Sequence, residues 1–127
     1  MKQNKVLVTG GGGFIGLALV KALCRQGNTV HVLGRHCYPA AEAVGAVSFQ
    51  GDIRNLEAVQ QAADSCDTVF HVAAKAGIWG PFQDYYSINV QGTLNVLTAC
   101  RKGGIKNLVY TSTPSVVFDG HDLCGTD

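Results

Sequence analysis

Five glycines, Gly10 to Gly13 and Gly16, follow a short run of β-forming residues in the stretch KVLVTGGGGFIG. This spacing is typical of a phosphate-binding turn, which can be aligned as Gly11-x-Gly13-x-x-Gly16 or as Gly10-x-x-Gly13-x-x-Gly16. In either alignment the first glycine permits a tight turn, and Gly13 lets the backbone approach a pyrophosphate. Gly16 would let the following helix pack closely on the strand. Phosphates would then meet free N–H groups at a helix N-terminus. We therefore expect a dinucleotide to bind at Gly10, Gly13, Phe14, Ile15 and Gly16.

The end of the second predicted strand indicates which dinucleotide would bind. NAD sites place Asp or Glu about 20 residues beyond the glycine loop, where the acid binds the ribose 2′-hydroxyl. Here no acidic residue lies between Gly16 and Glu42. Arg35 stands in this region instead, and a guanidinium can hold a 2′-phosphate through its charge and paired hydrogen bonds. We expect NADP(H), with NAD(H) as the alternative cofactor, and the competing interpretation makes Arg35 a solvated loop residue.

The stretch GDIR follows the third predicted strand and offers two candidates for contact with an adenine ring. Asp52 could accept a hydrogen bond from the exocyclic amine, and Ile53 would lie beside it. Alternatively, Asp52 caps the turn that follows, which is a common role for aspartate.

These residues need a scaffold, and the hydrophobic pattern predicts alternating strands and helices. The expected strands are residues 5–9, 29–35, 46–52, 67–74 and 107–113. The expected helices are residues 14–27, 55–66 and 85–104, with at most a short helix within 36–46. In the first helix, Ile15, Leu19 and Leu23 recur every four residues, beside Phe14 and Ala18, and form the expected buried face.

Three residues are predicted to end or begin helices. Gly27 and Gly104 follow apolar-periodic segments as glycine stops do, and Asn55 is the expected N-cap of the 55–66 helix. The alternation of elements requires right-handed crossovers and a parallel sheet covered on both faces. We therefore expect one α/β domain over residues 1–127, a doubly wound parallel sheet of the Rossmann type with strand order 3-2-1-4-5.

The composition excludes several classes of protein. In 127 residues, 46% are hydrophobic and 15% charged, which argues against disorder, and the net charge of +1 gives no electrostatic footprint for nucleic acid. No apolar run approaches the roughly 20 residues of a membrane-spanning helix. The five cysteines form no CxxC pair, so we expect reduced thiols in a cytoplasmic protein rather than disulfides or a metal site.

Several motifs together resemble one family, the extended short-chain dehydrogenase/reductases. They are, in order, TGGGGFIG, GDIR, HVAA, NVQGTLNVLTAC and LVYTST. The segment YTSTPSVVFDG is most similar to the branch that holds 3β-hydroxysteroid dehydrogenases, sterol-4-carboxylate 3-dehydrogenases and 2-alkyl-3-oxoalkanoate reductases. The resemblance implies an oxidoreductase that interconverts a secondary alcohol and a ketone on a 3-hydroxy/3-keto acid or sterol-like substrate. The alternatives are a nucleotide-sugar epimerase or dehydratase and, from another class, a non-catalytic dinucleotide-binding sensor or scaffold.

The resemblance also assigns roles to individual residues. Asn89 matches the family's asparagine, which holds a proton-relay water, and Thr113 matches the catalytic hydroxyl. The segment Ala73, Ala74 and Lys75 would line the pyrophosphate and the nicotinamide ribose. Each role has a simpler alternative. Asn89 would be an exposed helical asparagine, Thr113 a strand-end hydroxyl that bonds the backbone, and Lys75 a solvated loop residue.

The family's Tyr-x-x-x-Lys pair does not occur in this sequence. The last tyrosine is Tyr110 and the last lysine is Lys106, and neither Tyr85 nor Tyr86 has a lysine four residues on. We therefore expect the chain to be the N-terminal part of a longer enzyme, inactive by itself. Strand 107–113 would then be an apolar edge, so we expect the fragment to self-associate or aggregate. For the protein as a whole we expect a homo-oligomer.

Overall fold

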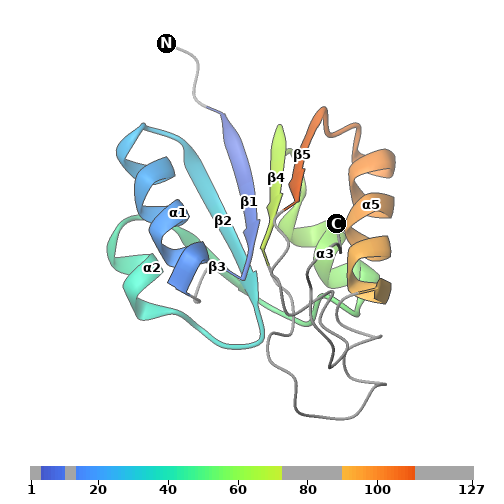
Figure 1. Ribbon diagram of the computed structural model, residues 1–127, viewed down its shortest axis with the longest axis horizontal. Coiled ribbons are helices and arrows are strands. Elements are labelled where there is room, and N and C mark those ends of the chain that lie inside the picture. The colour runs from blue at the N-terminus through green and yellow to red at the C-terminus, as the bar shows by residue number, and fades with distance from the viewer. Residues whose placement is uncertain (1–3, 11–13, 73–89, 111–127) are drawn as a thin grey trace, which may run out of the picture.

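The computed structural model describes residues 4–10, 14–72 and 90–110, and within these ranges parallel strands form one sheet with helices on both faces (Figure 1). The strands are β1 (Lys5–Thr9), β2 (Thr29–Gly34), β3 (Val47–Gln50), β4 (Thr68–His71) and β5 (Asn107–Tyr110). The helices are α1 (Phe14–Arg25), α2 (Pro39–Ala43), α3 (Leu56–Ala62) and α5 (Gly92–Gly103). The sheet order is β3-β2-β1-β4-β5, with all neighbours parallel, which confirms the predicted topology.

The central strands β1 and β2 are apolar along most of their length because helices cover both faces of the sheet. Val6 pairs with Val30, and Val8 pairs with Val32, in a parallel register that places β-branched side chains beside one another. Val8 and Val32 are fully buried. A parallel pair with this composition is stable only inside a doubly covered sheet.

Helix α1 ends where the sequence predicts, at a glycine with a left-handed backbone. Gly27 has a φ of 89°, and its N–H donates to the Cys24 carbonyl oxygen at 3.0 Å. The N–H of Asn28 donates to the Leu23 carbonyl oxygen at 3.2 Å. These two bonds form a Schellman motif, which satisfies carbonyl groups that the helix itself leaves unpaired.

The other helix signals are confirmed as well. The side-chain oxygen of Asn55 accepts from the N–H groups of Glu57 and Ala58, at 3.0 and 3.4 Å, and caps α3. Gly104 ends α5 with a φ of 66°. β3 and α3 are shorter than predicted. α5 begins at Gly92, and the predicted start of this helix at residue 85 lies outside the described residues.

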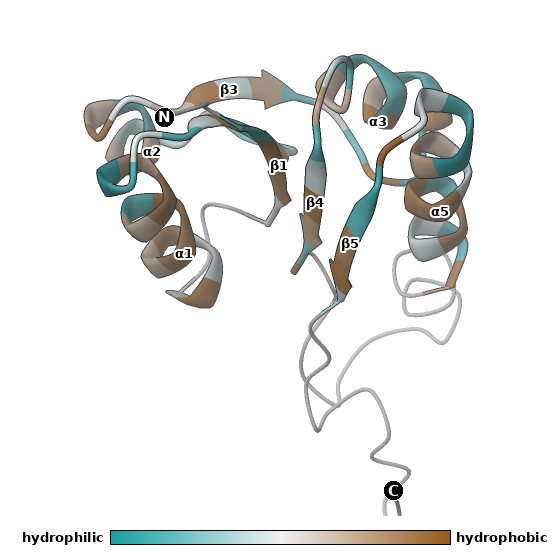
Figure 2. Cartoon of the chain, turned by 90° about the horizontal axis from the view of Figure 1, so that it is seen from above, coloured by the Kyte–Doolittle hydropathy of each residue, from teal (hydrophilic) through white to brown (hydrophobic). Residues whose placement is uncertain are grey.

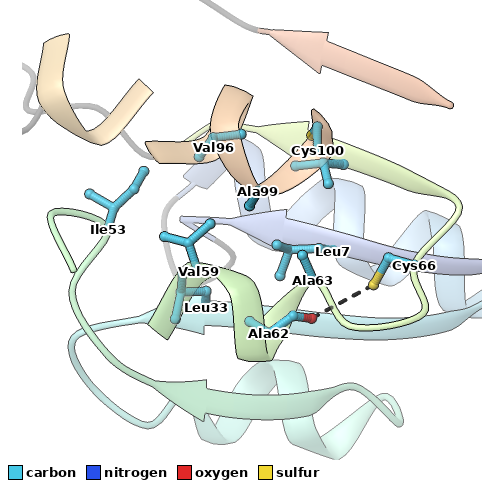
Figure 3. Packing of buried hydrophobic residues seen from close by; sticks show 11 residues of the cluster. Leu7, Leu33, Ile53, Val59, Ala62, Ala63, Cys66, Val96, Ala99 and Cys100 are labelled. Carbon is cyan, nitrogen blue, oxygen red and sulfur yellow. Dashed lines mark hydrogen bonds between the residues drawn. The ribbon is translucent and has the colours of Figure 1, made fainter. Parts of the chain in front are cut away.

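Two apolar clusters fill the spaces between sheet and helices, and Figure 2 shows one helix pair on each side of the sheet. The first, here called the α1–α2 core, consists of Val6, Val8, Val20, Leu23, Val30, Val32, Ala41 and Ala46. The second, the α3–α5 core, consists of Leu7, Leu33, Ile53, Val59, Ala62, Ala63, Cys66, Val69, Val96, Ala99 and Cys100 (Figure 3). Successive strand residues alternate between the two cores, as the pleat of a strand requires.

The predicted buried face of α1 is partly wrong. Ile15 is 54% exposed, Ala18 is exposed, and the buried positions are Gly16, Val20 and Leu23. A stripe through residues 16, 20 and 23 has the same helical period as the predicted one but is rotated by about one residue. The pattern of large apolar side chains predicted a different face, because Gly16 is buried but has no side chain to contribute to that pattern.

Candidate functional site

The carboxyl ends of the parallel strands lie at one edge of the sheet, where open α/β proteins bind their ligands. After β1 reaches this edge, Gly10 adopts a φ of 77°, a left-handed conformation that favours glycine. Its N–H donates to the carbonyl oxygen of Leu33 at 3.2 Å, which fastens the turn to the end of β2. The first glycine of the motif therefore makes a turn in which a residue with a Cβ would be strained.

Helix α1 begins at Phe14, shortly after this turn, and its first turn carries no acidic side chain. The partial positive charge of the helix N-terminus is therefore not neutralised locally and is available to an anion. Gly16 is buried within this first turn, while Ile15 is exposed. A left-handed glycine at the end of β1 and a helix N-terminus a few residues later are features that suit a pyrophosphate.

The ends of β2 and β3 are held together by backbone and side-chain hydrogen bonds. The N–H of Gly51 donates to the Gly34 carbonyl oxygen at 2.8 Å. The side-chain amide of Gln50 donates from Nε2 to the Arg35 carbonyl oxygen at 3.1 Å. Gln50 thus fixes the backbone of Arg35, whose side chain is exposed. Sequence reasoning missed this role, because a glutamine at a strand end has no distinguishing pattern.

Asp52 is engaged by Arg54, two residues further along the chain. Asp52 Oδ1 accepts from the backbone N–H of Arg54 at 2.9 Å and from its Nε at 3.0 Å, and Oδ2 lies 2.5 Å from Nη2. The side-chain bonds from Arg54 hold the pKa of Asp52 below its usual value, and the charge of Arg35 adds a smaller contribution. The carboxylate therefore caps the turn, as the alternative interpretation holds, and its contact with adenine stays a prediction.

Ile53 connects this turn to the second half of the sheet. It is 8% exposed and belongs to the α3–α5 core (Figure 3). A Cβ on Gly92 would lie 2.9 Å from Ile53 Cγ2, so α5 can approach only because residue 92 is glycine. The Asn95 side chain donates from Nδ2 to the Ile53 carbonyl oxygen at 3.0 Å. These contacts place Ile53 beneath α5, and its predicted role at the adenine stays a prediction.

A second polar group lies at the ends of β1 and β4 and was not assigned a role from the sequence. His71 is 2% exposed; its Nδ1 lies 2.8 Å from Thr9 Oγ1 and its Nε2 lies 3.0 Å from Thr93 Oγ1. Thr9 Oγ1 also accepts from the N–H of Val72 at 3.0 Å. Burial lowers the pKa of His71 to about 4, so the imidazole is neutral near pH 7. The ring joins β1, β4 and α5 without adding charge.

The structure places some of the predicted site residues and leaves others outside its description. Those described are Gly10, Ile15, Gly16, Arg35, Asp52 and Ile53, together with the backbone of Phe14. Gly10, Arg35 and Asp52 follow strands at the carboxyl edge of one sheet. The predicted residues Gly13, Ala73, Ala74, Lys75, Asn89 and Thr113 lie outside the described residues.

Three further features concern the described residues: membrane-spanning helices, metal sites and free thiols. None of their helices is long and apolar enough to cross a membrane. Within residues 4–10, 14–72 and 90–110, no group of three His, Cys, Asp or Glu side chains is placed to hold a metal ion. The cysteines in these ranges, Cys24, Cys37, Cys66 and Cys100, carry free thiols.

Comparison with known proteins gives matches over nearly the whole chain. Residues 7–126 match the model of the 3-beta hydroxysteroid dehydrogenase/isomerase family. A 2-alkyl-3-oxoalkanoate reductase from Shewanella oneidensis is 48% identical over 124 residues, which cover 98% of this chain and 32% of that protein. A 3 beta-hydroxysteroid dehydrogenase/Delta 5-->4-isomerase from Mycobacterium tuberculosis is 36% identical, with coverage of 98% and 35%. The chain therefore spans about a third of the length of the curated relatives it matches.

A solved structure shows the same fold. The UDP-glucose 4-epimerase of Thermus thermophilus, in complex with NAD, superposes with a TM-score of 0.76 at 36% identity. The superposition covers 86% of this chain and 37% of the epimerase chain. The likeness extends to a protein that carries a dinucleotide on this sheet architecture.

Proposed function

Since the chain belongs to the 3-beta hydroxysteroid dehydrogenase/isomerase family, we propose that it forms the dinucleotide-binding part of an NADP(H)-dependent oxidoreductase. The reaction would interconvert a secondary alcohol and a ketone, on a 3-hydroxy/3-keto acid or sterol-like substrate. The 48% identity to a 2-alkyl-3-oxoalkanoate reductase supports the keto-acid class in particular. We also propose a homo-oligomer with a cytoplasmic location, and the free thiols of the described cysteines are compatible with that location.

The observation that carries the choice of NADP(H) is the charge at the ends of β2 and β3. Two guanidinium groups, of Arg35 and Arg54, lie near a single carboxylate, that of Asp52. That carboxylate already accepts hydrogen bonds from Arg54. The local charge is therefore net positive, which favours a ribose 2′-phosphate over a 2′-hydroxyl.

The chain also supplies groups for the pyrophosphate and for the reacting end. The turn at Gly10 and the N-terminus of α1 would hold the pyrophosphate. When bound, the nicotinamide supplies or accepts the hydride. Thr113 would donate a hydrogen bond to the substrate carbonyl oxygen, and Asn89 would hold a water for proton relay. Neither group is an adequate proton donor near neutral pH without a partner base.

A nucleotide-sugar epimerase is the second candidate, favoured by the likeness to the Thermus thermophilus enzyme. An NAD-dependent epimerase of this fold would use an acid at the end of β2 for the ribose hydroxyls. Gly34 and Arg35 occupy this place. The charge at the site therefore favours the reductase.

The test is a pair of assays on the protein expressed from its complete coding sequence. We expect NADPH oxidation with 2-alkyl-3-keto acids or 3-ketosteroids, at higher kcat/KM than with NADH, and no epimerisation of UDP-glucose. Residues 1–127 alone are expected to give no turnover, since they contain no Tyr-x-x-x-Lys pair. Preference for NADH, or epimerase activity without ketone reduction, would contradict the proposal.

A further inference from the structure

Gly34, the last residue of β2, has no room for a side chain. It lies about 20 residues after Gly16, the interval at which NAD sites place their ribose-binding acid. A Cβ built on Gly34 would have Tyr38 atoms as its three nearest neighbours: Cζ at 2.6 Å, with the hydroxyl oxygen and Cε2 closer still. The φ of Gly34 is not among the positive values of the described glycines. The backbone would therefore accept a larger residue, and the Tyr38 phenol is what opposes it.

Tyr38 is held in this position by its own local structure. It is the N-cap residue of α2, extended at φ −121° and ψ 91°, a conformation that the following Pro39 favours. Its carbonyl oxygen accepts from the N–H groups of Ala41 and Glu42, at 3.0 and 3.1 Å. The ring itself packs against the α1–α2 core. The phenol can therefore leave the space above Gly34 only by giving up apolar contacts.

We propose that Tyr38 excludes an NAD-type acid from the end of β2, because its phenol fills the space in which the side chain of that acid would stand. With that space occupied, the end of β2 offers no carboxylate to a ribose 2′-hydroxyl. The 2′ position is then left to Arg35, whose backbone Gln50 fixes. This inference rests on the proposed preference for NADP(H), and it adds the residue that bars the NAD-type acid at position 34.

A double-mutant cycle tests the idea through cofactor dissociation constants, measured by titration of the protein from its complete coding sequence. Gly34→Asp alone should weaken NADPH binding without improving NADH binding, because the new carboxylate cannot reach its place. Tyr38→Ala alone should change the NADPH/NADH ratio less than tenfold, because Arg35 remains. The double variant should bind NADH at least tenfold more tightly than Gly34→Asp does.

The matched control is Tyr38→Phe combined with Gly34→Asp. Phenylalanine keeps the ring and removes only the hydroxyl, so this pair should gain no NADH affinity. If Gly34→Asp by itself improves NADH binding as much as the double variant does, Tyr38 does not exclude the acid and the inference is overturned.

A stability measurement keeps the inference testable without any cofactor. Gly34→Ala should lower the melting temperature when Tyr38 is present, since the added methyl collides with the phenol. In a Tyr38→Ala background the same change should leave the melting temperature unchanged or raise it, because alanine restricts the unfolded chain. Equal effects in both backgrounds would overturn the inference. A wild-type protein that does not prefer NADPH would instead contradict the proposed function. The difference between the effects of Gly34→Ala with and without Tyr38 would still test the steric exclusion.

Discussion

Two polar groups lie at the same edge of the sheet and differ in almost every physical respect. At the ends of β2 and β3, Arg35 and Arg54 are exposed and charged around Asp52. At the ends of β1 and β4, His71 is buried and neutral between Thr9 and Thr93. We call these the charged end and the neutral end.

The difference follows from how each group is assembled. The charged end is made mainly by residues close in sequence, on turns that face solvent, so its side chains can stay ionised. The neutral end is made by residues about 60 and 22 positions apart, and packing removes them from water. A charge there would lose its hydration, so the polar groups pair as neutral hydrogen bonds. One edge thus carries exposed charges at one end and joins strands through neutral hydrogen bonds at the other.

The largest expected effect is on the glycine loop, which follows Thr9 of the neutral end directly in the sequence. Gly13→Val should abolish dinucleotide binding, a loss of at least about 100-fold in affinity, because a β-branched side chain would occupy the pyrophosphate space and resist a positive φ. Cofactor titration with circular dichroism checks this. Gly103→Ala is the control, since a Cβ there meets only ordinary contacts with Ile105 at 3.7 Å. Wild-type affinity in Gly13→Val would refute the assignment of the loop.

The neutral end should be essential for stability. His71→Ala leaves a cavity and removes the imidazole bonds to Thr9 and Thr93, and we expect it to lower the free energy of unfolding by about 3 kcal/mol at pH 7. Urea unfolding measures this, with the exposed His36→Ala as a control that should change little. A loss below about 1 kcal/mol would show that the Thr9–His71–Thr93 bonds contribute little.

The same residue predicts a pH dependence. The pKa of His71 is lowered from its usual 6.5 to about 4 in the folded protein, so the unfolded state binds the proton more tightly. The stabilising contribution is complete above about pH 6.5 and is lost as the pH falls towards 4. In His71→Phe this loss should vanish between pH 6.5 and 4, while His36→Ala should keep it. An identical pH profile in wild type and His71→Phe would contradict the pKa assignment.

The charged end should control affinity rather than stability. Arg35→Asp should reduce NADPH affinity by about tenfold to 100-fold, the value of about 1.5–3 kcal/mol for a hydrogen bond to a charged group, and should favour NADH. Lys102→Asp, at the last turn of α5, is the charge-matched control and should leave the preference unchanged. An Arg35→Asp protein that keeps its NADPH preference would show that Arg35 is a solvated loop residue.

The smallest effect is expected at the ion pair of the charged end. Both side chains of the Arg54–Asp52 pair are partly exposed, so Arg54→Gln should lower the free energy of unfolding by less than about 1 kcal/mol. It should also raise the pKa of Asp52 towards its usual value, because the side-chain hydrogen bond from Arg54 is the main cause that lowers it. NMR titration of the carboxyl group reads this directly, and an unchanged pKa would contradict the stated cause.

Features that depend on neighbouring residues along the chain could be predicted from the sequence. Helix ends at Gly27, Asn55 and Gly104 were predictable because caps depend on neighbouring residues and on the backbone freedom of glycine. The strand order followed from the alternation of strands and helices and from the handedness of crossovers. The glycine turn and Arg35 could be found in the sequence for the same reason. The turn follows the first strand, and Arg35 lies at a characteristic distance beyond the turn.

Contacts between residues on different helices and strands became known only from the three-dimensional arrangement. The partners of His71, the space that Tyr38 fills above Gly34, and the contact of Gly92 with Ile53 all join different elements. The buried face of α1 belongs here too, because it includes Gly16, which adds nothing to the pattern of large apolar side chains. Such pairs are set by close packing and burial. Because the paired residues lie on different elements, their contact produces no repeating pattern in the sequence.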